Sequence, residues 1–170
     1  NKRMKKYWHI LLVMFCFVLS ASSCSDDNEE VIDEAWKLKN EEAFNAKAFE
    51  AGYNRIESQG KEGSIYYKVL KAGTGKQPLY TSTVKVYYKG SLVDGTKFDQ
   101  KLFEDGSPFT TLVAGQTILG WTVALQHMHV GDKWEVWIPQ ELGYGKTGQG
   151  EIPAYSTLIF EMELVEISAM

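Results

Sequence analysis

The stretch GWTVALQHMHVGDKWEVWIP, residues 120–139, changes its periodicity halfway along. Its first half carries apolar residues at helical spacing and ends near Gly131, a residue suited to a helix C-terminus. These apolar residues are Trp121, Leu125 and Met128. In the second half, Trp134, Val136 and Ile138 alternate with other residues, as in a half-buried strand. A short helix followed at once by such a strand predicts a domain of the α+β class.

Three other stretches alternate in the same way: SIYYKVL at 64–70, STVKVYYKG at 82–90 and TLIFEMELVEI at 157–167. The inward residues of the last stretch are expected to be Leu158, Phe160, Met162 and Leu164. Asp-Gly turn signals lie at residues 94–95 and 105–106. The pattern predicts an antiparallel, twisted β-sheet wrapped around one short α-helix.

A second helix is predicted upstream, over residues 33–51. Asp33 is suited to cap its N-terminus, and Gly52 to end it. A narrow stripe lies near one of its faces, formed by Trp36, Ala43, Phe44, Ala48 and Ala51. Three roles remain open for this helix: it packs on the domain, it pairs with a second copy to form a homodimer, or it acts as a spacer.

The first 24 residues are typical of a secretory signal. Basic residues precede an apolar run at 10–19, which is short for a membrane span, and small residues then lead to Cys24. This end resembles a bacterial lipoprotein signal, in which Cys24 becomes lipidated and anchors the protein to a membrane. The alternative is an ordinary signal peptide with an incidental cysteine.

The acidic run SDDNEE after Cys24 resembles a surface-export signal, and the alternative is a solvated linker. We therefore expect a lipoprotein of the cell envelope, at the outer membrane, on either its periplasmic face or the cell surface. The expected segments are a lipoprotein signal peptide over 1–23, an acidic tether over 24–32, a helix and linker over 33–58, and the sheet domain over 59–170.

Charge and cysteine content exclude several classes of function. The formal net charge is −4, and several of the basic residues lie in the leader, so nucleic acid is not an expected partner. Cys16 and Cys24 are the only cysteines. The body after Cys24 therefore has no thiolate nucleophile and no disulfide, and it depends on its core alone for stability.

Two short stretches resemble known motifs, a phosphate-binding loop and a histidine metal site, but neither has the residues in the required positions. Gly145-Lys146-Thr147 resembles the end of a phosphate-binding loop, but Gln140 stands where that loop needs a glycine. His127 and His129 would point about 200° apart on a helix, so they do not form a shared metal site. We expect neither a metal nor a cofactor.

The remaining candidates are aromatic residues near the ends of elements: Tyr88, Phe98, Trp121, Tyr144 and Phe160. Taken singly, an aromatic residue in a strand is more often part of a core. Together with the acidic residue Asp99 beside Phe98, they predict an apolar cup with a polar rim.

Three blocks carry a resemblance to a known family: VYYKGSLVDGTKFDQ, ILGWTVALQHMHVGDKWEVWIPQELGYG and IPAYSTLIFEMELVEI. In order and spacing they resemble the FKBP-type peptidyl-prolyl cis-trans isomerases, over residues 63–167. The resemblance implies an antiparallel sheet curled around one short helix, in agreement with the periodicity.

The resemblance also implies a set of site residues. The catalytic residues would be Asp99, a carboxylate at the rim, and Tyr144, whose hydroxyl donates to a substrate carbonyl. Trp121 would form the floor, and the backbone N–H of Ile152, before Pro153, would meet the ligand. The substrate-binding set is Tyr88, Phe98, Phe109, Ile118, Trp121, Ile152 and Phe160.

The sequence departs from the family pattern at the side of this site. Thr111 stands where a second aromatic residue is expected, Thr117 where an aliphatic residue is common, and Gln149 where some members carry histidine. The base of the pocket is complete, whereas its side wall, its substrate preference and the binding of macrolide inhibitors are open.

The implied activity is cis–trans isomerisation of X–Pro bonds in proline-containing polypeptides, which would assist the folding of envelope or exported proteins. One alternative is a non-catalytic module that binds proline peptides or holds unfolded chains. Another is a surface lipoprotein whose N-terminal helix recruits a partner.

Overall fold

The segment that changes period forms helix α3 (Leu119–Leu125) and strand β6 (Lys133–Ile138) in the computed structural model, which describes residues 33–169. Its predicted inward residues are buried: Trp121, Leu125, Met128, Trp134, Val136 and Ile138. The helix ends at Leu125, earlier than predicted. Gly131, the predicted stop, has a φ of +95° in the turn that leads into β6.

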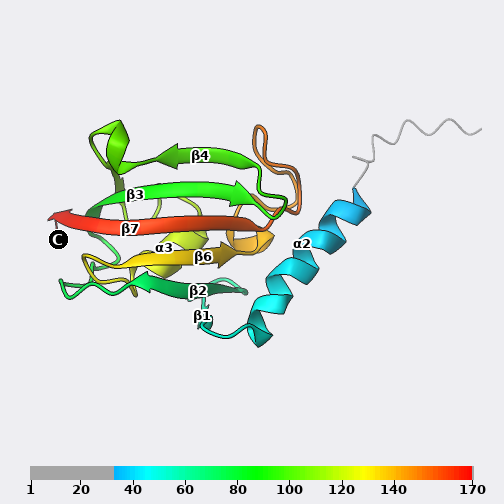
Figure 1. Cartoon of the computed structure of the whole chain (residues 1–170), viewed down its shortest axis with the longest axis horizontal. Helices are drawn as coiled ribbons and strands as arrows, with labels where there is room; N and C mark the ends of the chain where they lie inside the picture. Colours follow the sequence, from blue (N-terminus) through cyan, green and yellow to red (C-terminus); the bar gives the residue numbers. More distant parts are fainter. Residues whose placement is uncertain (1–32, 170) are drawn as a thin grey trace, which may run out of the picture. The chain divides into compact units, whose positions relative to one another are not determined.

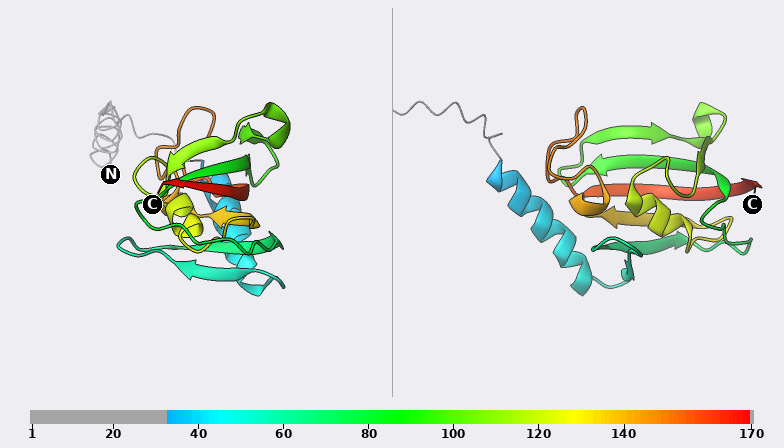
Figure 2. Two further views of the ribbon diagram at one scale, coloured as in Figure 1. Left: turned by 90° about the vertical axis from the view of Figure 1, so that its left-hand side faces the viewer. Right: turned by 180° about the vertical axis from the view of Figure 1, so that it is seen from behind.

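The described strands form one antiparallel sheet in the order β1-β2-β6-β7-β3-β4, with β5 also paired to β3. Their bounds are β1 (Asn54–Glu57), β2 (Ser64–Lys71), β3 (Thr83–Leu92), β4 (Lys97–Lys101), β5 (Phe109–Leu112) and β7 (Leu158–Ala169). Short 3-10 turns are η1 (Lys47–Phe49), η2 (Phe103–Asp105) and η3 (Gln140–Leu142). Figures 1 and 2 show a twisted sheet with α3 against one face, which confirms the predicted fold class.

The core lies between α3 and the inner face of the sheet. Alternate residues of β3, β6 and β7 point into it, because side chains of a strand alternate between the two faces. On β7 the buried residues are Leu158, Phe160, Met162 and Leu164, as predicted. These central strands hold the functional residues in fixed register.

Strand β1 lies in the segment that was predicted to be a linker. It pairs with β2 through Asn54–Tyr67 and Glu57–Ser64, so the sheet begins before residue 59. Its side chains are mostly exposed, and Arg55 forms an ion pair of 2.8 Å with Glu57. An edge strand with both faces largely in solvent has no apolar alternation to reveal it.

Helix α2 (Glu34–Ala46) forms within the predicted range, and the Asp33 carboxylate caps it by accepting from Trp36 N at 2.9 Å. It ends at Ala46 and continues into η1, so the prediction that it reaches Ala51 was wrong. Ala51 is exposed in the turn that follows.

One face of α2 packs on its own domain, which is the first of the three open roles, and pairing with a second copy stays a prediction. Asn40 is the fully buried residue of this helix, and Phe44 contacts Tyr66 with ring centroids 5.0 Å apart. At the C-terminal end, the Lys47 ammonium lies 4.1 Å from the centroid of the Trp137 ring. Figure 1 shows the helix lying across one end of the sheet.

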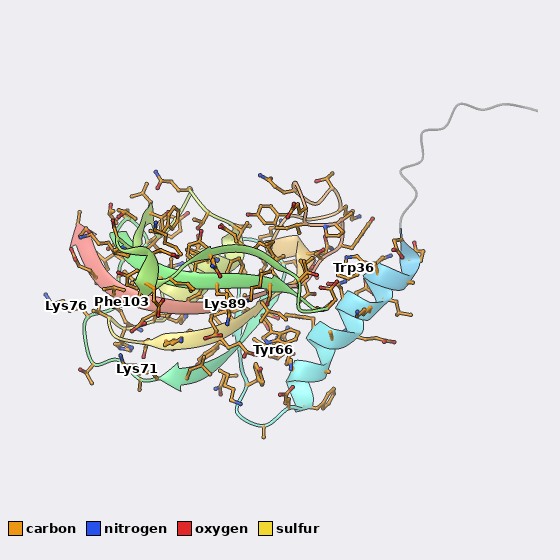
Figure 3. The ribbon with its side chains drawn as sticks, turned by 45° about the horizontal axis from the view of Figure 1, so that its top comes forward. Trp36, Tyr66, Lys71, Lys76, Lys89 and Phe103 are labelled. Carbon is orange, nitrogen blue, oxygen red and sulfur yellow. The ribbon has the colours of Figure 1, made fainter. Side chains whose placement is uncertain are left out.

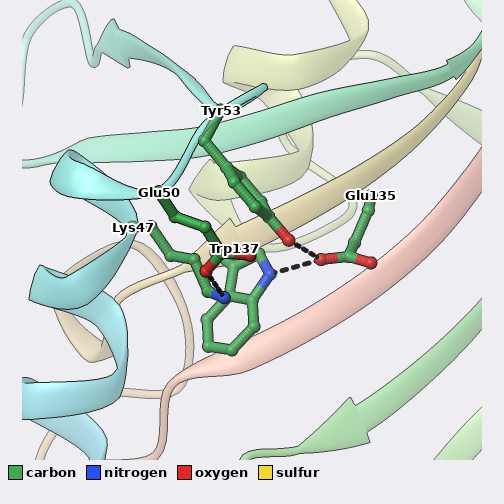
Figure 4. Close-up of polar contacts among 5 residues, drawn as sticks. All are labelled: Lys47, Glu50, Tyr53, Glu135 and Trp137. Atoms are coloured by element: carbon green, nitrogen blue, oxygen red, sulfur yellow. Dashed lines mark hydrogen bonds and ion pairs between the residues drawn. The ribbon is translucent and has the colours of Figure 1, made fainter.

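A polar network holds this end of α2 against β6 (Figure 4). The hydroxyl of Tyr53 and the indole N–H of Trp137 both donate to Glu135, the latter at 2.7 Å. Lys47 also forms an ion pair with Glu50. Burial, and then the hydrogen bond to Glu135, raise the pKa of Tyr53, so this donor stays protonated.

The signal peptide, Cys24 and the acidic tether lie outside the described residues. Within residues 33–169, no helix has the length and apolar character needed to cross a membrane. The same described part contains no cluster of three or more histidine, cysteine or acidic residues placed to hold a metal ion.

Candidate active site

Five aromatic side chains meet between the inner face of the sheet and α3: Tyr88, Phe98, Phe109, Trp121 and Phe160. The Trp121 ring lies 5.0 Å from Tyr88 and 5.4 Å from Phe160, measured between centroids. These two contacts are edge-on, an arrangement that aromatic pairs prefer. We call this group the aromatic cluster.

The aromatic cluster is closed at its base and open at its side. Trp121 and Phe160 are each 4% exposed, whereas Phe109 is 37% exposed. Tyr88 and Phe98 are half-buried between these extremes. The structure thus brings the predicted aromatic residues together around a buried floor, and their contact with a substrate stays a prediction.

Two glycines, neither of them among the predicted site residues, allow the rings to approach the sheet this closely. A Cβ on Gly90 would lie 2.6 Å from ring carbons of Phe98 and 2.9 Å from the Phe160 ring. A Cβ on Gly120, next to Trp121, would lie 2.4 Å from Ile138. Both distances are too short for any side chain. Both glycines lie within the sequence blocks that resemble the FKBP-type family, and this position is the signal in the sequence that could have identified them.

Asp99 lies at the exposed rim, on edge strand β4. Its Oδ2 accepts the hydroxyl proton of Tyr88 at 2.7 Å, and its Oδ1 accepts from the backbone N–H of Gln100 at 2.8 Å. Burial, and then this contact with Asp99, raise the pKa of Tyr88. The carboxylate therefore fixes the Tyr88 ring and places a negative charge at the rim.

Tyr144 lies just after η3, and its ring is half-buried. Burial, followed by the negative charge of Asp99, raises the pKa of its hydroxyl, which therefore stays protonated at neutral pH. This hydroxyl donates to no acceptor among residues 33–169. It is a neutral donor available to a ligand.

Residues 145–155, which we call the flap, form a loop closed on itself. The backbone N–H of Tyr155 donates to Gly145 O, and Gln149 and Ile152 exchange two backbone hydrogen bonds, all at 2.9 Å. The N–H of Ile152, expected to meet the ligand, is therefore engaged within the flap. The N–H of Ile118, at the start of α3, has no acceptor in the described part of the chain.

The hydroxyl groups of Thr111 and Thr117, the two threonines that depart from the family pattern, both face the interior of the protein. Thr111 is buried, and its hydroxyl lies 3.2 Å from Leu112 O. The hydroxyl oxygen of Thr117 is buried without a partner among the described residues. The side wall thus has smaller and more polar residues than the family pattern predicts.

A groove of about 470 Å³ lies mainly over the outer face of the sheet, and Tyr88 is the one member of the aromatic cluster that lines it. Lys89, Lys133 and Glu161 line it and are ion-paired with one another, and Phe103 projects beside them (Figure 3). Glu161 pairs with both lysines, whereas Glu104, which also lines the groove, has no ion pair among residues 33–169. The aromatic cluster, with the unpaired Tyr144 hydroxyl nearby and a buried floor, is the better candidate for chemistry.

A family profile described as FKBP-type peptidyl-prolyl cis-trans isomerase matches residues 75–165. The chain belongs to this family. The match contains every predicted catalytic and substrate-binding residue, from Tyr88 to Phe160, and the FKBP-type fold is confirmed. Helix α2 and strands β1 and β2 precede the matched region.

Known FKBP-type proteins resemble the chain over most of its described length. The FKBP-type peptidyl-prolyl cis-trans isomerase FkpA of Aeromonas hydrophila is 43% identical over 129 residues, 76% of this chain and 46% of that protein. The outer membrane protein MIP of Legionella longbeachae is 44% identical over 104 residues, 61% of this chain and 44% of that protein.

A solved peptidyl-prolyl cis-trans isomerase from Pseudomonas syringae superposes with a TM-score of 0.68 at 33% identity, covering 79% of this chain and 95% of that one. The chain spans less than two thirds of the length of the curated FKBP-type relatives it matches.

Proposed function

We propose that the chain catalyses cis–trans isomerisation of X–Pro peptide bonds at the aromatic cluster, and so assists the folding of exported proteins. The observation that carries the proposal is the buried aromatic floor, Trp121 and Phe160, flanked by a free and protonated hydroxyl on Tyr144. Membership of the FKBP-type family supports the same activity.

The physical task is rotation about an amide. The barrier is about 18–20 kcal/mol because rotation breaks amide resonance. An X–Pro bond isomerises in tens to hundreds of seconds without catalysis. The twisted amide has lost its resonance charge separation, so an apolar cup favours it over the planar ground state. Each tenfold acceleration requires about 1.4 kcal/mol of such differential binding.

Polar groups around the cup would hold the peptide in register. The Tyr144 hydroxyl would donate to a carbonyl beside the proline. The N–H of Ile118 is the better candidate for a second donor, since the N–H of Ile152 already bonds Gln149 O at 2.9 Å. The side chain of Ile152, 7% exposed, would contribute apolar surface.

Asp99 would act electrostatically and not as a proton carrier. Its two oxygens accept from Tyr88 and from the N–H of Gln100. In this role it keeps the Tyr88 ring edge-on to Trp121, and, after burial, its charge contributes to the raised pKa of the Tyr144 hydroxyl.

NMR exchange spectroscopy on a peptide with an aliphatic residue before proline tests the activity. We expect acceleration by residues 33–170, and a loss of about tenfold in kcat/KM for Tyr144→Phe, the equivalent of one hydrogen bond. Asp99→Ala is expected to lose at least as much. Glu104→Gln, on exposed η2, is the matched control and is expected to keep full activity.

Binding of the peptide without faster exchange would contradict the isomerase. It would favour the alternative of a non-catalytic binder or holdase. Absence of both binding and acceleration would remove the aromatic cluster as a functional site.

We also propose that Cys24 is lipidated and anchors the protein in the cell envelope, at the outer membrane. The leader composition supports this proposal, as does similarity to a protein named as an outer membrane protein. In cells that process lipoproteins, Cys24→Ser is expected to abolish incorporation of labelled palmitate and release the protein from membranes. Unchanged fractionation of this variant would contradict the anchor.

Self-association through α2 remains a prediction. The free face of α2, with Leu38 55% exposed, is what a second copy would use. Sedimentation of residues 33–170 tests it, and a monomer at all concentrations would contradict a homodimer.

A further inference from the structure

Helix α2 makes its most deeply buried contact with the segment 153–157, which leads from the flap into β7. Asn40 is fully buried, and its side-chain oxygen accepts from Thr157 N at 2.7 Å. The hydroxyl of Thr157 donates to Asn40 O at 3.2 Å, and the Asn40 amide donates to Trp36 O at 2.7 Å. A buried amide with such partners is satisfied in one position only, so the contact sets where α2 and Thr157 lie relative to each other.

A second connection reaches the flap itself. The indole N–H of Trp36 donates to Ser156 Oγ at 3.1 Å, and the Ser156 hydroxyl donates to Pro153 O at 2.7 Å. Ser156 is 3% exposed, so water competes little with these bonds. Figure 3 shows Trp36 where α2 meets the sheet domain. This chain of two hydrogen bonds ends one residue from Ile152.

The residue between these contacts has an unusual backbone. Tyr155 has a φ of +60°, a left-handed conformation that non-glycine residues rarely adopt. Such a conformation persists where its surroundings hold it. Here the Lys37 ammonium lies 5.2 Å from the centroid of the Tyr155 ring, and Tyr155 N donates to Gly145 O at 2.9 Å. Gly145 directly follows Tyr144.

We infer that α2 braces the active site, with Asn40 and Trp36 as positioning residues for the flap and for Tyr144. Three consecutive residues of the segment 153–157, namely Tyr155 to Thr157, contact α2. The first of them, Tyr155, is hydrogen-bonded to Gly145, the residue after Tyr144. The catalytic part of this inference rests on the proposed isomerase function. Since α2 lies outside the residues that match the family, the brace is an addition to the FKBP-type domain.

The test compares residues 33–170 carrying Asn40→Ala or Trp36→Phe with the wild type, well below their melting temperatures. Amide hydrogen exchange by NMR is read at Gln149, Ile152 and Tyr155, whose N–H groups bond within the flap. We expect these amides to lose protection selectively, while the central strands β3 and β7 keep theirs. We expect kcat/KM to fall by about tenfold, because small displacements of positioning groups have effects of this size. Leu38→Ala, on the exposed face of α2, is the control and is expected to change neither readout.

Trp36→Phe removes the indole donor and keeps a smaller aromatic ring, so it serves if Asn40→Ala does not fold. Unchanged flap protection with unchanged kcat/KM would overturn the inference. Equal loss of protection in the flap and in β7 would also overturn it, since it would show a general loss of stability. If the wild type does not accelerate exchange, the proposed function fails, and hydrogen exchange at the flap still decides whether α2 braces it.

Discussion

At the residue scale, the site depends on a glycine that has no side chain as much as on the aromatic side chains around it. Gly90 lies opposite Phe160 on β7 and Asp99 on β4, and its bare Cα leaves room for two aromatic rings. Asp99 then fixes Tyr88 from the rim. The geometry of the aromatic cluster is therefore set jointly by a strand register, a glycine and one carboxylate.

Gly90→Ala is expected to displace the Phe98 and Phe160 rings, since its Cβ would come within 2.9 Å of both. Overpacking of this kind destabilises proteins by about 1–3 kcal/mol. Urea unfolding measures the loss, and kcat/KM is expected to fall with it. Ser91→Ala, the next residue of β3, is the control, and equal stability of the two variants would contradict the packing role of Gly90.

The pKa of Tyr88 is raised, so its stabilising effect has a defined pH range. An unfolded tyrosine ionises near pH 10, whereas folded Tyr88 stays protonated. Above about pH 10 the unfolded state therefore binds fewer protons, and the free energy of unfolding falls as the pH rises. The difference in this free energy between the wild type and Tyr88→Phe is expected to be constant from pH 7 to 9 and to shrink above pH 10. A difference that grows above pH 10 would contradict the assignment.

The resemblance of three sequence blocks named aromatic residues that the structure brings together beside Asp99. Tyr88 and Phe160 come from central strands of fixed register, whereas Phe98 and Trp121 come from β4 and α3. The role that it implies for the N–H of Ile152 stays a prediction, and within the flap this N–H bonds Gln149 O at 2.9 Å. Whether a backbone N–H is free depends on its hydrogen-bond partner in the loop, which here is Gln149. The spacing of apolar residues in the sequence does not indicate such a partner.

At the scale of elements, alternation predicted the central strands and missed the edges. Strands β3, β6 and β7 each have one buried face, and their apolar residues alternate accordingly. Strands β1 and β4 are exposed along most of their length and leave no such pattern. Even in β2 the pattern is misleading at one end. Val69 lies on the same face of the strand as buried Ile65 but is 44% exposed, because the second half of this strand extends beyond the core.

Three central strands are linked on their outer face by a charge ladder. Glu161 of β7 accepts from Lys89 of β3 at 2.7 Å and from Lys133 of β6 at 3.1 Å. The hydrogen bond from Lys89 is the main cause that lowers the pKa of Glu161, with Lys133 contributing. The folded state thus favours the ionised carboxylate, and this stability is present above the ordinary pKa of 4.5.

Glu161→Gln is expected to lower the free energy of unfolding at pH 7 by about 0.5–1 kcal/mol, the range for partly exposed ion pairs. The difference from wild type is expected to disappear as the pH falls below about 4.5, where the carboxylate becomes protonated in the unfolded state first and then in the folded state. Urea titrations from pH 3 to 7 measure it. Glu104→Gln is the control, since Glu104 makes no ion pair among residues 33–169, and a loss that persists at pH 3 would contradict the ladder.

At the scale of the whole molecule, the described chain is one unit from residue 32 onward. The sequence predicted a helix at its start but left its role open, because the partners of Asn40 and Trp36 lie about 120 residues away in the chain. Asn40 interrupts the apolar stripe of α2, and a polar residue at such a position is not recognised as an interface residue until its partner is known.

We expect residues 33–170 to be more stable than residues 59–170, the domain as the sequence delimits it. The shorter chain lacks β1 and α2, so it exposes the edge of β2, the Trp137 ring and the N–H of Thr157. Loss of this packing and hydrogen bonding is expected to lower the free energy of unfolding by several kcal/mol. Thermal unfolding followed by circular dichroism measures it, and equal melting temperatures would show that α2 and β1 add nothing to the fold.

The open edges of the sheet have a consequence for the proposed function, in which the protein meets unfolded chains. An unpaired strand edge invites other chains to add strands, which leads to aggregation. Here the edge strand β1 carries Arg55 and Glu57, and the edge strand β4 carries Lys97 and Lys101. Charged edges discourage such pairing. Strand β5, which pairs with β3 alone, is uncharged but only four residues long, and short edge strands also offer little to pair with. A client polypeptide would then be gripped through its proline side chain and released, and would not be captured as an additional strand.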